Sequence, residues 1–305
     1  MAESRHPDGG LHPIGRVERV LVAAHAAKGD ATRSLGRIES WLAERGLEVR
    51  TEPDLWEYAA RREQSMIRGE EQPPFDLAIV LGGDGAILSA VRAFRDAPVP
   101  VLGINFGRVG FLAAVPASRW EETVQSVLDG EALVEPRMRV LLRYRTVAGE
   151  LWAVALNDVV VSRAPEDPML QIGLDIGQDW VTDYRADGLI LATPSGSTAY
   201  SLSAGGPILA PSMLGIVVTP ICSQALANRP LVLDPQSELR VRLSNADQRA
   251  DIVVDGQRFG VLAPGEELLI ERHPVPYPLI SMPDLDPWRR LRSRLGWSGD
   301  VRPDR

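Results

Sequence analysis

A continuous apolar run that ends in a glycine-rich turn constrains the fold more than any other feature of this sequence. Residues 75–81 form a nearly unbroken hydrophobic segment, which is typical of a parallel strand covered on both faces. The turn Gly82-Gly83-Asp84-Gly85 follows at once, and apolar residues then recur at helical spacing over 86–95. Because glycine accepts the backbone conformations of tight turns, the pattern predicts the strand, turn and helix of a doubly wound α/β sheet.

The same alternation of strands and helices extends over the N-terminal part of the chain. Strands are predicted at 20–24, 47–50 and 99–104, and a helix is predicted at 31–45, where Gly46 follows the last periodic residue. The charged residues 52–74 are compatible with a loop or with a poorly packed helix. We therefore predict a Rossmann-like α/β domain over 17–115, preceded by a flexible tail at 1–16.

After residue 116 the pattern changes to short strands separated by turns. Apart from one helix near 120–128, segments of strand length alternate with turn signals such as Asp255-Gly256. This spacing predicts a β-rich, sandwich-like domain over 116–282. A short amphipathic helix is expected in the C-terminal segment 283–305 and could dock back on the α/β domain. The strands expected in the β-rich domain are 139–144, 151–156, 159–163, 171–176, 189–193, 216–219, 239–243, 251–254 and 268–272.

Composition excludes several classes of function. The net charge of −8 is poorly matched to a phosphate backbone, so we expect no nucleic-acid partner. Cys222 is the only cysteine, which excludes an intrachain disulfide and a thiolate zinc cluster and favours the reducing cytoplasm. No segment has the apolar length of a membrane span or the apolar centre of a secretory signal, so no membrane association is expected.

Lysine is almost absent, and this restricts how phosphate can be bound. Lys28 is the only lysine in the sequence, and it lacks the glycine spacing of a GxxxxGK[ST] phosphate-binding loop. Any phosphate must therefore be held by backbone amides, by arginine or by a metal ion.

Asp84 is the first candidate for chemistry. A carboxylate held between glycines at the carboxyl end of a parallel strand lies where ligands bind in such sheets. It could take a proton from a substrate hydroxyl or support a metal ion. A tight turn with a capping aspartate would have the same sequence, and the turn alone does not separate the two interpretations.

Two further clusters carry polar groups suited to a nucleotide. The pair Asn157-Asp158 can bind the hydroxyls or amides of a nucleoside, although the same pair is also common in turns. The segment 187–207 runs from a buried strand into a turn crowded with hydroxyls and then into a short helix. Hydroxyls and free amides at a helix start bind phosphate or ribose without lysine. Core packing and a solvated face both explain this segment poorly.

These segments occur in the order and approximate spacing of the NAD kinase family, which the sequence resembles. The resemblance extends over about residues 75–282 and is most specific in 187–207. It implies transfer of the terminal phosphate of ATP to the 2′-hydroxyl of the adenosine ribose of NAD, giving NADP, with Mg²⁺ as the expected divalent cation. The segments that carry it are Gly82–Gly85 with Ile87-Leu88, Gly103–Asn105, Gly110–Leu112, Asn157-Asp158, Asp187–Pro207, Thr219–Cys222, Asn228–Leu231 and Asp255–Gln257.

The resemblance also implies roles for individual residues. Asp84 would act as the base on the 2′-hydroxyl, with Gly85 beside it at the nucleotide. Asn157 and Asp158 would hold ribose and nicotinamide-side groups. No residue is assigned as a dedicated metal ligand, and a homodimer or homotetramer is implied. The other residues that the resemblance places at the dinucleotide are Arg185, Asp187, Thr198, Ala199, Tyr200, Ser201, Leu202, Ser203 and Gln257.

The sequence departs from the family pattern at four places, and two alternative functions stay open. Ala86 stands for a usual Thr, Asp158 for Glu, Ser195 for Thr, and Ser223-Gln224 for Pro-His. Ala86 removes one hydroxyl near the phosphates and is the feature that favours a non-catalytic NAD-binding sensor. A GGDG-type kinase of a lipid or a sugar is the other alternative, although its acceptor motifs GTxND and PKTIDND are missing from the chain.

Overall fold

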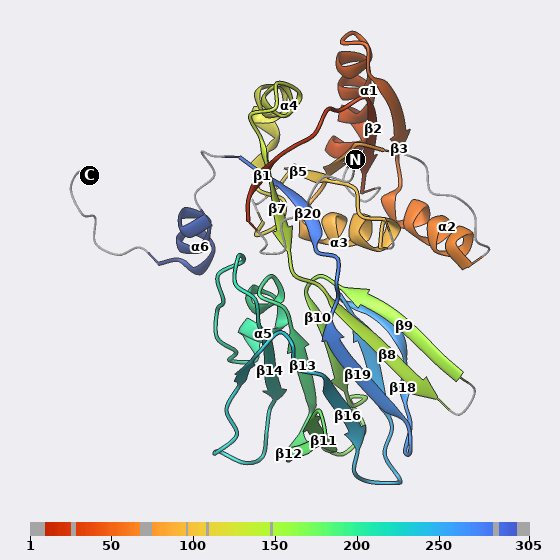
Figure 1. The fold of residues 1–305 in the computed structure, drawn as a ribbon, viewed down its shortest axis with the longest axis vertical. Helices are drawn as coiled ribbons and strands as arrows, with labels where there is room; N and C mark the ends of the chain where they lie inside the picture. The colour runs from red at the N-terminus through yellow and green to blue at the C-terminus, as the bar shows by residue number, and fades with distance from the viewer. Residues whose placement is uncertain are drawn as a thin grey trace. The chain divides into compact units, whose positions relative to one another are not determined.

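The computed structural model describes residues 10–25, 29–67, 75–95, 97–107, 110–146, 149–282 and 287–297 (Figure 1). The chain divides into two compact units, Met1–Pro136 with Tyr277–Arg305, and Arg137–Pro276. Within the described residues, every helix is too short or too polar to cross a membrane.

The first unit is built on a mixed sheet whose described strands run in the order β1-β7-β20-β5-β4-β2-β3, with β6 paired to β5. Its central strands are parallel, as predicted, and β4 and β5 are buried along their whole length. A strand buried on both faces has to be apolar throughout, which is why these strands were visible in the sequence. The strand bounds are His12–Pro13 (β1), Arg19–Ala24 (β2), Glu48–Glu52 (β3), Leu77–Leu81 (β4), Val101–Asn105 (β5), Val115–Pro116 (β6), Leu133–Arg137 (β7) and Tyr277–Ser281 (β20).

Four helices of the first unit lie between these strands in the chain. The predicted helices are confirmed as α1 (Gly29–Ala43), α3 (Asp84–Ala93) and α4 (Trp120–Leu128). The open question about residues 52–74 is answered by α2 (Leu55–Ile67). Asp54 caps this helix, because its Oδ1 accepts hydrogen bonds from the amides of Trp56 and Glu57, at 2.9 and 3.2 Å. Leu55, Tyr58 and Ala59 are buried, so the helix is anchored despite its charge.

Both ends of the first unit differ from the expected domain limits. Residues 1–9 lie outside the described residues, but His12–Pro13 form β1, which pairs with β7 (Leu133–Arg137), and Ile14 is buried. Residues 10–16 are therefore tied to the sheet and are not a free tail. The strand β20 (Tyr277–Ser281) pairs with β5, so the second unit spans 137–276 instead of the expected 116–282.

The C-terminal helix is present as α6 (Pro287–Leu295). Its Leu291 is buried, and the Arg294 guanidinium lies 5.5 Å from the centre of the Phe111 ring. Since Phe111 belongs to the first unit, the helix contacts the α/β unit.

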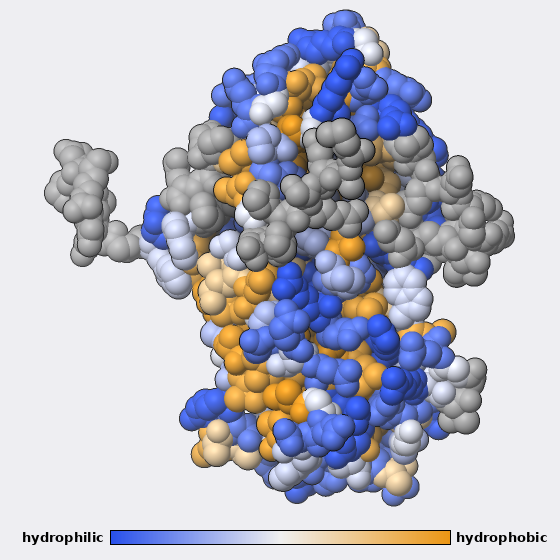
Figure 2. Space-filling model, in the orientation of Figure 1, coloured by the Kyte–Doolittle hydropathy of each residue, from blue (hydrophilic) through white to orange (hydrophobic). Residues whose placement is uncertain are grey.

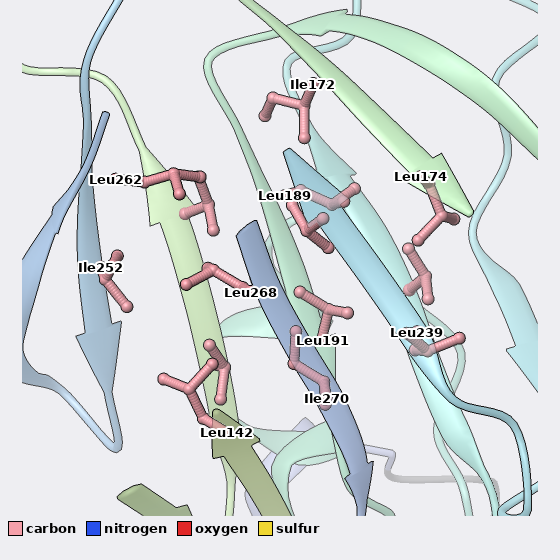
Figure 3. Packing of buried hydrophobic residues seen from close by; sticks show 14 of the residues in the cluster. Leu142, Ile172, Leu174, Leu189, Leu191, Leu239, Ile252, Leu262, Leu268 and Ile270 are labelled. Atoms are coloured by element: carbon pink, nitrogen blue, oxygen red, sulfur yellow. The ribbon is translucent and has the colours of Figure 1, made fainter. Parts of the chain in front are cut away.

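The second unit is a sandwich of two antiparallel sheets, as predicted. The described strands run in the orders β15-β14-β13-β10-β17-β18 and β12-β11-β16-β19-β8-β9. Alternate residues of both sheets form one core, with Leu142 and Leu268 from one sheet and Leu189 and Leu191 from the other (Figure 3). The strand bounds are Val140–Thr146 (β8), Gly149–Ala155 (β9), Asp158–Ser162 (β10), Leu170–Ile176 (β11), Asp179–Ala186 (β12), Gly188–Ala192 (β13), Ile216–Ile221 (β14), Leu231–Leu233 (β15), Leu239–Leu243 (β16), Ala250–Val254 (β17), Gln257–Leu262 (β18) and Glu267–Arg272 (β19).

The hydroxyl-rich segment covers the outer face of the sheet that contains β13. It forms a single 3-10 turn, η2 (Gly196–Thr198), and one helical turn, α5 (Tyr200–Ser203), which packs on β13 (Figure 1). Leu209 beyond this segment joins Ile190 and Ala192 of β13 in a small apolar cluster on the same face. This packing places the segment beside the end of β13 that continues into Thr193.

Candidate functional site

Asp84 is the first residue of α3 and follows the carboxyl end of β4. Its Oδ2 accepts a hydrogen bond from the amide of Phe111 at 2.9 Å, and its Oδ1 accepts bonds from the next two amides, each at 3.0 Å. Two carboxylate oxygens offer about four acceptor positions, so Oδ2 retains capacity for one more donor. The carboxylate is half-buried and Gly85 beside it is exposed. The group is fixed in place and still open to a ligand.

Gly110 explains how the loop after β5 comes so close to this carboxylate. A Cβ atom on Gly110 would lie 1.9 Å from Oδ1 of Asp84, so a side chain cannot be placed there. The two glycine-containing segments that the sequence showed separately, Gly82–Gly85 and Gly110–Leu112, therefore form one structure. Arg108 and Val109 lie outside the described residues.

A second aspartate binds three consecutive amides in the other unit. Oδ2 of Asp255 accepts a hydrogen bond from the amide of Leu156 at 2.8 Å, and Oδ1 accepts bonds from those of Asn157 and Asp158 at 2.7 and 3.1 Å. The amide of Asp255 in turn donates to the carbonyl of Asp158 at 3.0 Å. Sequence reasoning missed this residue and treated it only as a turn, because its partners lie almost a hundred positions away along the chain.

The carbonyl side of the same backbone segment is bound by Thr193. The Thr193 amide donates to the carbonyl of Asn157 at 2.8 Å, and its hydroxyl donates to the carbonyl of Leu156. A Cβ atom on Gly196 would lie 2.0 Å from the Asn157 carbonyl oxygen, so the glycine turn also lies against this segment. The backbone of 156–158 is consequently held on both edges.

Two polar side chains of this segment, those of Asn157 and Asp158, place acceptor groups away from water. Among the described residues, Oδ1 of Asn157 is buried without a hydrogen-bond partner. Asp158 is only 5 % exposed, and burial, reinforced by the nearby Asp255 carboxylate, raises its pKa to about 7. Burial also raises the pKa of Asp255 to about 6, although its three amide donors oppose the shift. A buried acceptor without a donor is costly, so Asn157 is suited to meet a donor of a ligand.

The hydroxyls of the predicted dinucleotide segment have two different environments. Ser201 is fully buried and its hydroxyl pairs with that of Thr219 at 2.9 Å, while Ser197 bonds the backbone of Pro194 and Leu209. These hydroxyls stabilise the segment itself. The Thr198 hydroxyl donates to the carbonyl of Ser195 at 3.0 Å and remains half-buried. The remaining predicted residues are the exposed Tyr200 and Ser203 and the half-buried Ala199 and Leu202.

The last three predicted residues, Gln257, Arg185 and Asp187, do not lie together. Gln257 opens β18, pairs with Val254 and follows Asp255 closely, so it belongs to the same end as Asn157. Asp187 precedes β13 and lies about 20 Å along the strand from Thr193. It is half-buried and forms an ion pair with Arg163 at 2.7 Å, and Arg185 is exposed on β12. The structure therefore does not bring Arg185 and Asp187 together with Asn157.

Comparisons with known proteins cover both units. A model of the ATP-NAD kinase N-terminal domain matches residues 20–132, and one of the C-terminal domain matches residues 156–282. The NAD kinase of Syntrophotalea carbinolica is 36% identical over 284 residues, which are 92% of this chain and 99% of that protein. The NAD kinase of Gemmatimonas aurantiaca is 38% identical over 253 residues, 81% of this chain and 85% of that protein.

Two solved structures are similar in fold. An NAD kinase from Archaeoglobus fulgidus in complex with ATP has a TM-score of 0.67 and 28% identity, covering 91% of this chain and 97% of that one. A yeast NADH kinase complexed with NADH has a TM-score of 0.81 at 24% identity, covering 95% of this chain and 91% of that one, which supports the fold alone.

Proposed function

Because the chain belongs to the NAD kinase family, we propose that its two aspartate-centred clusters perform separate parts of phosphoryl transfer from ATP to NAD. The activity itself follows from membership: the chain is a phosphotransferase that makes NADP by phosphorylating the 2′-hydroxyl of the adenosine ribose of NAD. These relatives do not favour a lipid or sugar kinase or a non-catalytic sensor.

Asp84 is proposed as the base that receives the proton of the 2′-hydroxyl. The observation that carries this role is the carboxylate itself, which is anchored by three amides and has one acceptor position open. Phosphoryl transfer depends mainly on positioning and charge stabilisation, so a carboxylate that is fixed in position is adequate. Gly85 offers exposed backbone next to it for the nucleotide.

NAD binding is proposed for the end of the second sheet that carries Asn157. The unpartnered Oδ1 of Asn157 can accept a hydrogen bond from a ribose hydroxyl or from the nicotinamide amide. Asp158 and Gln257 lie at the same end, and the exposed Tyr200 and Ser203 belong to the segment whose Gly196 lies against Asn157. Arg185 and Asp187 receive no direct contact with the group bound at Asn157, since they lie at the opposite end of β13.

The divalent cation is proposed to arrive with ATP as part of the substrate. No group of three or more His, Cys, Asp or Glu that could hold a metal ion occurs in the part of the chain that the structure describes. The Asp84 carboxylate, which lies within the glycine turn Gly82–Gly85, is already bound to three amides. Mg²⁺ is commonly held by substrate phosphates with few protein ligands, and this chain fits that mode.

A donor and acceptor panel tests the proposal. The protein is incubated with ATP or polyphosphate, with NAD or NADH, and with Mg²⁺ or EDTA, and NADP is measured with an NADP-specific dehydrogenase. We expect NADP from ATP, NAD and Mg²⁺ and none with EDTA. Absence of NADP from every donor would overturn the proposed activity.

We also propose a homo-oligomer in the cytoplasm. Large apolar side chains of the second unit reach the surface, and the view in Figure 2 shows apolar patches over β13, β14 and α5. Oligomers bury such patches.

The proposed cytoplasmic location is supported by Cys222, which is exposed, since an exposed thiol suits a reducing compartment. Light scattering in solution tests the assembly, and fractionation of the producing cell tests the location. The exposed residues near β14 and β15 are Met213, Leu214, Leu226 and Val232.

A further inference from the structure

Asp255 is half-buried, its carboxyl group is removed from water, and the reaction outlined above has no use for it. It adopts a left-handed backbone conformation, with φ of 47°, and Gly256 after it has φ of 76°. Aspartate tolerates this conformation better than most residues. The turn directs the carboxylate toward the amides of 156–158, which lead from the end of β9 into the start of β10. A surface turn between β17 and β18 would need no such group.

We propose that Asp255 is a positioning residue for NAD: its carboxylate fixes the backbone of 156–158 so that Asn157 faces the dinucleotide. This inference rests on the proposed NAD kinase function. The carboxylate binds three consecutive amides, while Thr193 binds the carbonyls of the same residues. The direction of the Asn157 side chain is thereby determined before NAD binds, which reduces the ordering cost of binding.

The surroundings of Asp158 favour its neutral form. Strand alternation places it on the same face as Val160, directly opposite Ala192 of β13, on a face that is otherwise apolar. From the turn after β17, the charge that acts on it is that of Asp255. The turn after β13 presents hydroxyls, and Nη1 of Arg137 lies 3.4 Å from the hydroxyl of Ser195 there. Within the described residues no cation is paired with Asp158.

Two adjacent buried carboxyl groups cannot both ionise cheaply. Asp255 accepts hydrogen bonds from three amides, whereas the Asp158 carboxyl group accepts none from the described residues, so Asp255 ionises first and Asp158 retains the proton. Because burial and the Asp255 charge raise the pKa of Asp158 to about 7, its ionisation falls within the working range of pH. Above that pH, repulsion between the two carboxylates disturbs the backbone of 156–158, and NAD binds more weakly.

The substitution Asp255→Asn tests the positioning role. Its amide group can accept some of the three bonds but presents N–H groups to at least one amide, so we expect the Kd for NAD to rise at least about tenfold. The Kd is measured by calorimetry without ATP, and the KM values of NAD and ATP are measured beside it. A KM for NAD that rises while the KM for ATP and kcat stay within about threefold supports the proposal. The matched control is Asp251→Asn. Asp251 lies on β17, just before the turn of Asp255, and pairs with Arg258 at the surface, so this substitution should leave the Kd unchanged.

A second measurement decides the question if Asp255→Asn does not fold. In the unmodified protein the Kd for NAD should rise at least about threefold from pH 6.5 to pH 8.5, and in Asp158→Asn this rise should disappear, because asparagine cannot ionise. An equal Kd for NAD in Asp255→Asn and the unmodified protein, or an identical pH profile with and without Asp158, overturns the inference. Failure of the proposed function looks different, since the unmodified protein would then form no NADP.

Discussion

Asp84 in the first unit and Asp255 in the second unit each bind the amides of three consecutive residues, but they do so in different surroundings. Asp84 is half-buried, precedes the exposed Gly85 at the start of α3 and has one oxygen able to accept another donor. Asp255 is half-buried too, but its carboxyl group is turned inward, where burial raises its pKa, and all of its described contacts are to backbone. The same arrangement thus supports two roles: a carboxylate beside exposed backbone can act on substrate, whereas a carboxyl group turned away from water shapes the chain around it.

The largest expected effect separates these two roles. Asp84→Asn should lower kcat by about 10³-fold or more, because the amide cannot accept the proton of the 2′-hydroxyl, while NAD still binds. Turnover and the Kd for NAD are measured on the same preparation. Asp76→Asn is the matched control, since Asp76 also accepts two backbone amides in the first unit, from Glu18 and Arg19, at 3.0 and 2.8 Å. Near-normal turnover in Asp84→Asn would remove Asp84 as the base.

A second prediction concerns stability and pH in the second unit. Burial raises the pKa of Asp158 from 3.8 to about 7, so the folded protein keeps a proton that the unfolded chain releases. Stability from this group is therefore greatest at low pH and is lost as pH rises from about 4 to about 7, by about 4 kcal/mol in total. Asp158→Asn should flatten this part of the profile. Urea denaturation of both proteins at pH 5 and pH 8 measures it, and an equal pH dependence in both would contradict the prediction.

Two glycines allow the comparison to be tested without changing either aspartate. In Gly110→Ala the new Cβ would lie 1.9 Å from Oδ1 of Asp84, and in Gly196→Ala it would lie 2.0 Å from the Asn157 carbonyl oxygen. Overpacking of this kind costs about 1–3 kcal/mol and displaces the group it meets. We expect Gly110→Ala to lower kcat by about 10–100-fold with little change in NAD binding.

Gly196→Ala should weaken NAD binding more than it lowers kcat, which is the reverse of the effect expected for Gly110→Ala. Because it disturbs the backbone of 156–158, we expect the Kd for NAD to rise about tenfold while kcat at saturating NAD falls less. Steady-state kinetics and calorimetry on the two variants provide the comparison. If both variants lost kcat and NAD affinity in equal measure, the assignment of separate roles to the two clusters would fail.

The sequence predicted the parts of the fold that depend on local pattern. The strands of the first sheet were visible because burial on both faces leaves almost only apolar residues, as in Leu77–Leu81. The strands β1, β7 and β20 were not assigned to that sheet, because strand pairing between distant segments leaves no local mark. The helix α2 stayed open because its charged residues obscured the cap at Asp54.

The candidate site was predictable to a similar degree. Asp84 was identified from the glycines around it, and the turn at Asn157 from its polar pair. The role of Asp255 depends on amides that lie 97–99 positions away, and the fate of a hydroxyl such as that of Ser201 depends on which neighbour it meets after folding. Residue type therefore indicated where chemistry could occur, and tertiary contacts decided which side chains were free for it.

The smallest expected effect comes from a glycine that has room. Gly36 lies in α1, and an added Cβ would have nothing within 4 Å, in contrast to Gly110 and Gly196. Glycine inside a helix costs conformational entropy, so Gly36→Ala should raise the free energy of unfolding by about 0.5–1 kcal/mol and leave NADP formation and NAD binding unchanged. Urea denaturation and the coupled NADP assay measure both. A loss of activity here would mean that any added methyl group in the first unit impairs turnover, and the effect of Gly110→Ala could then no longer be attributed to the Asp84 carboxylate.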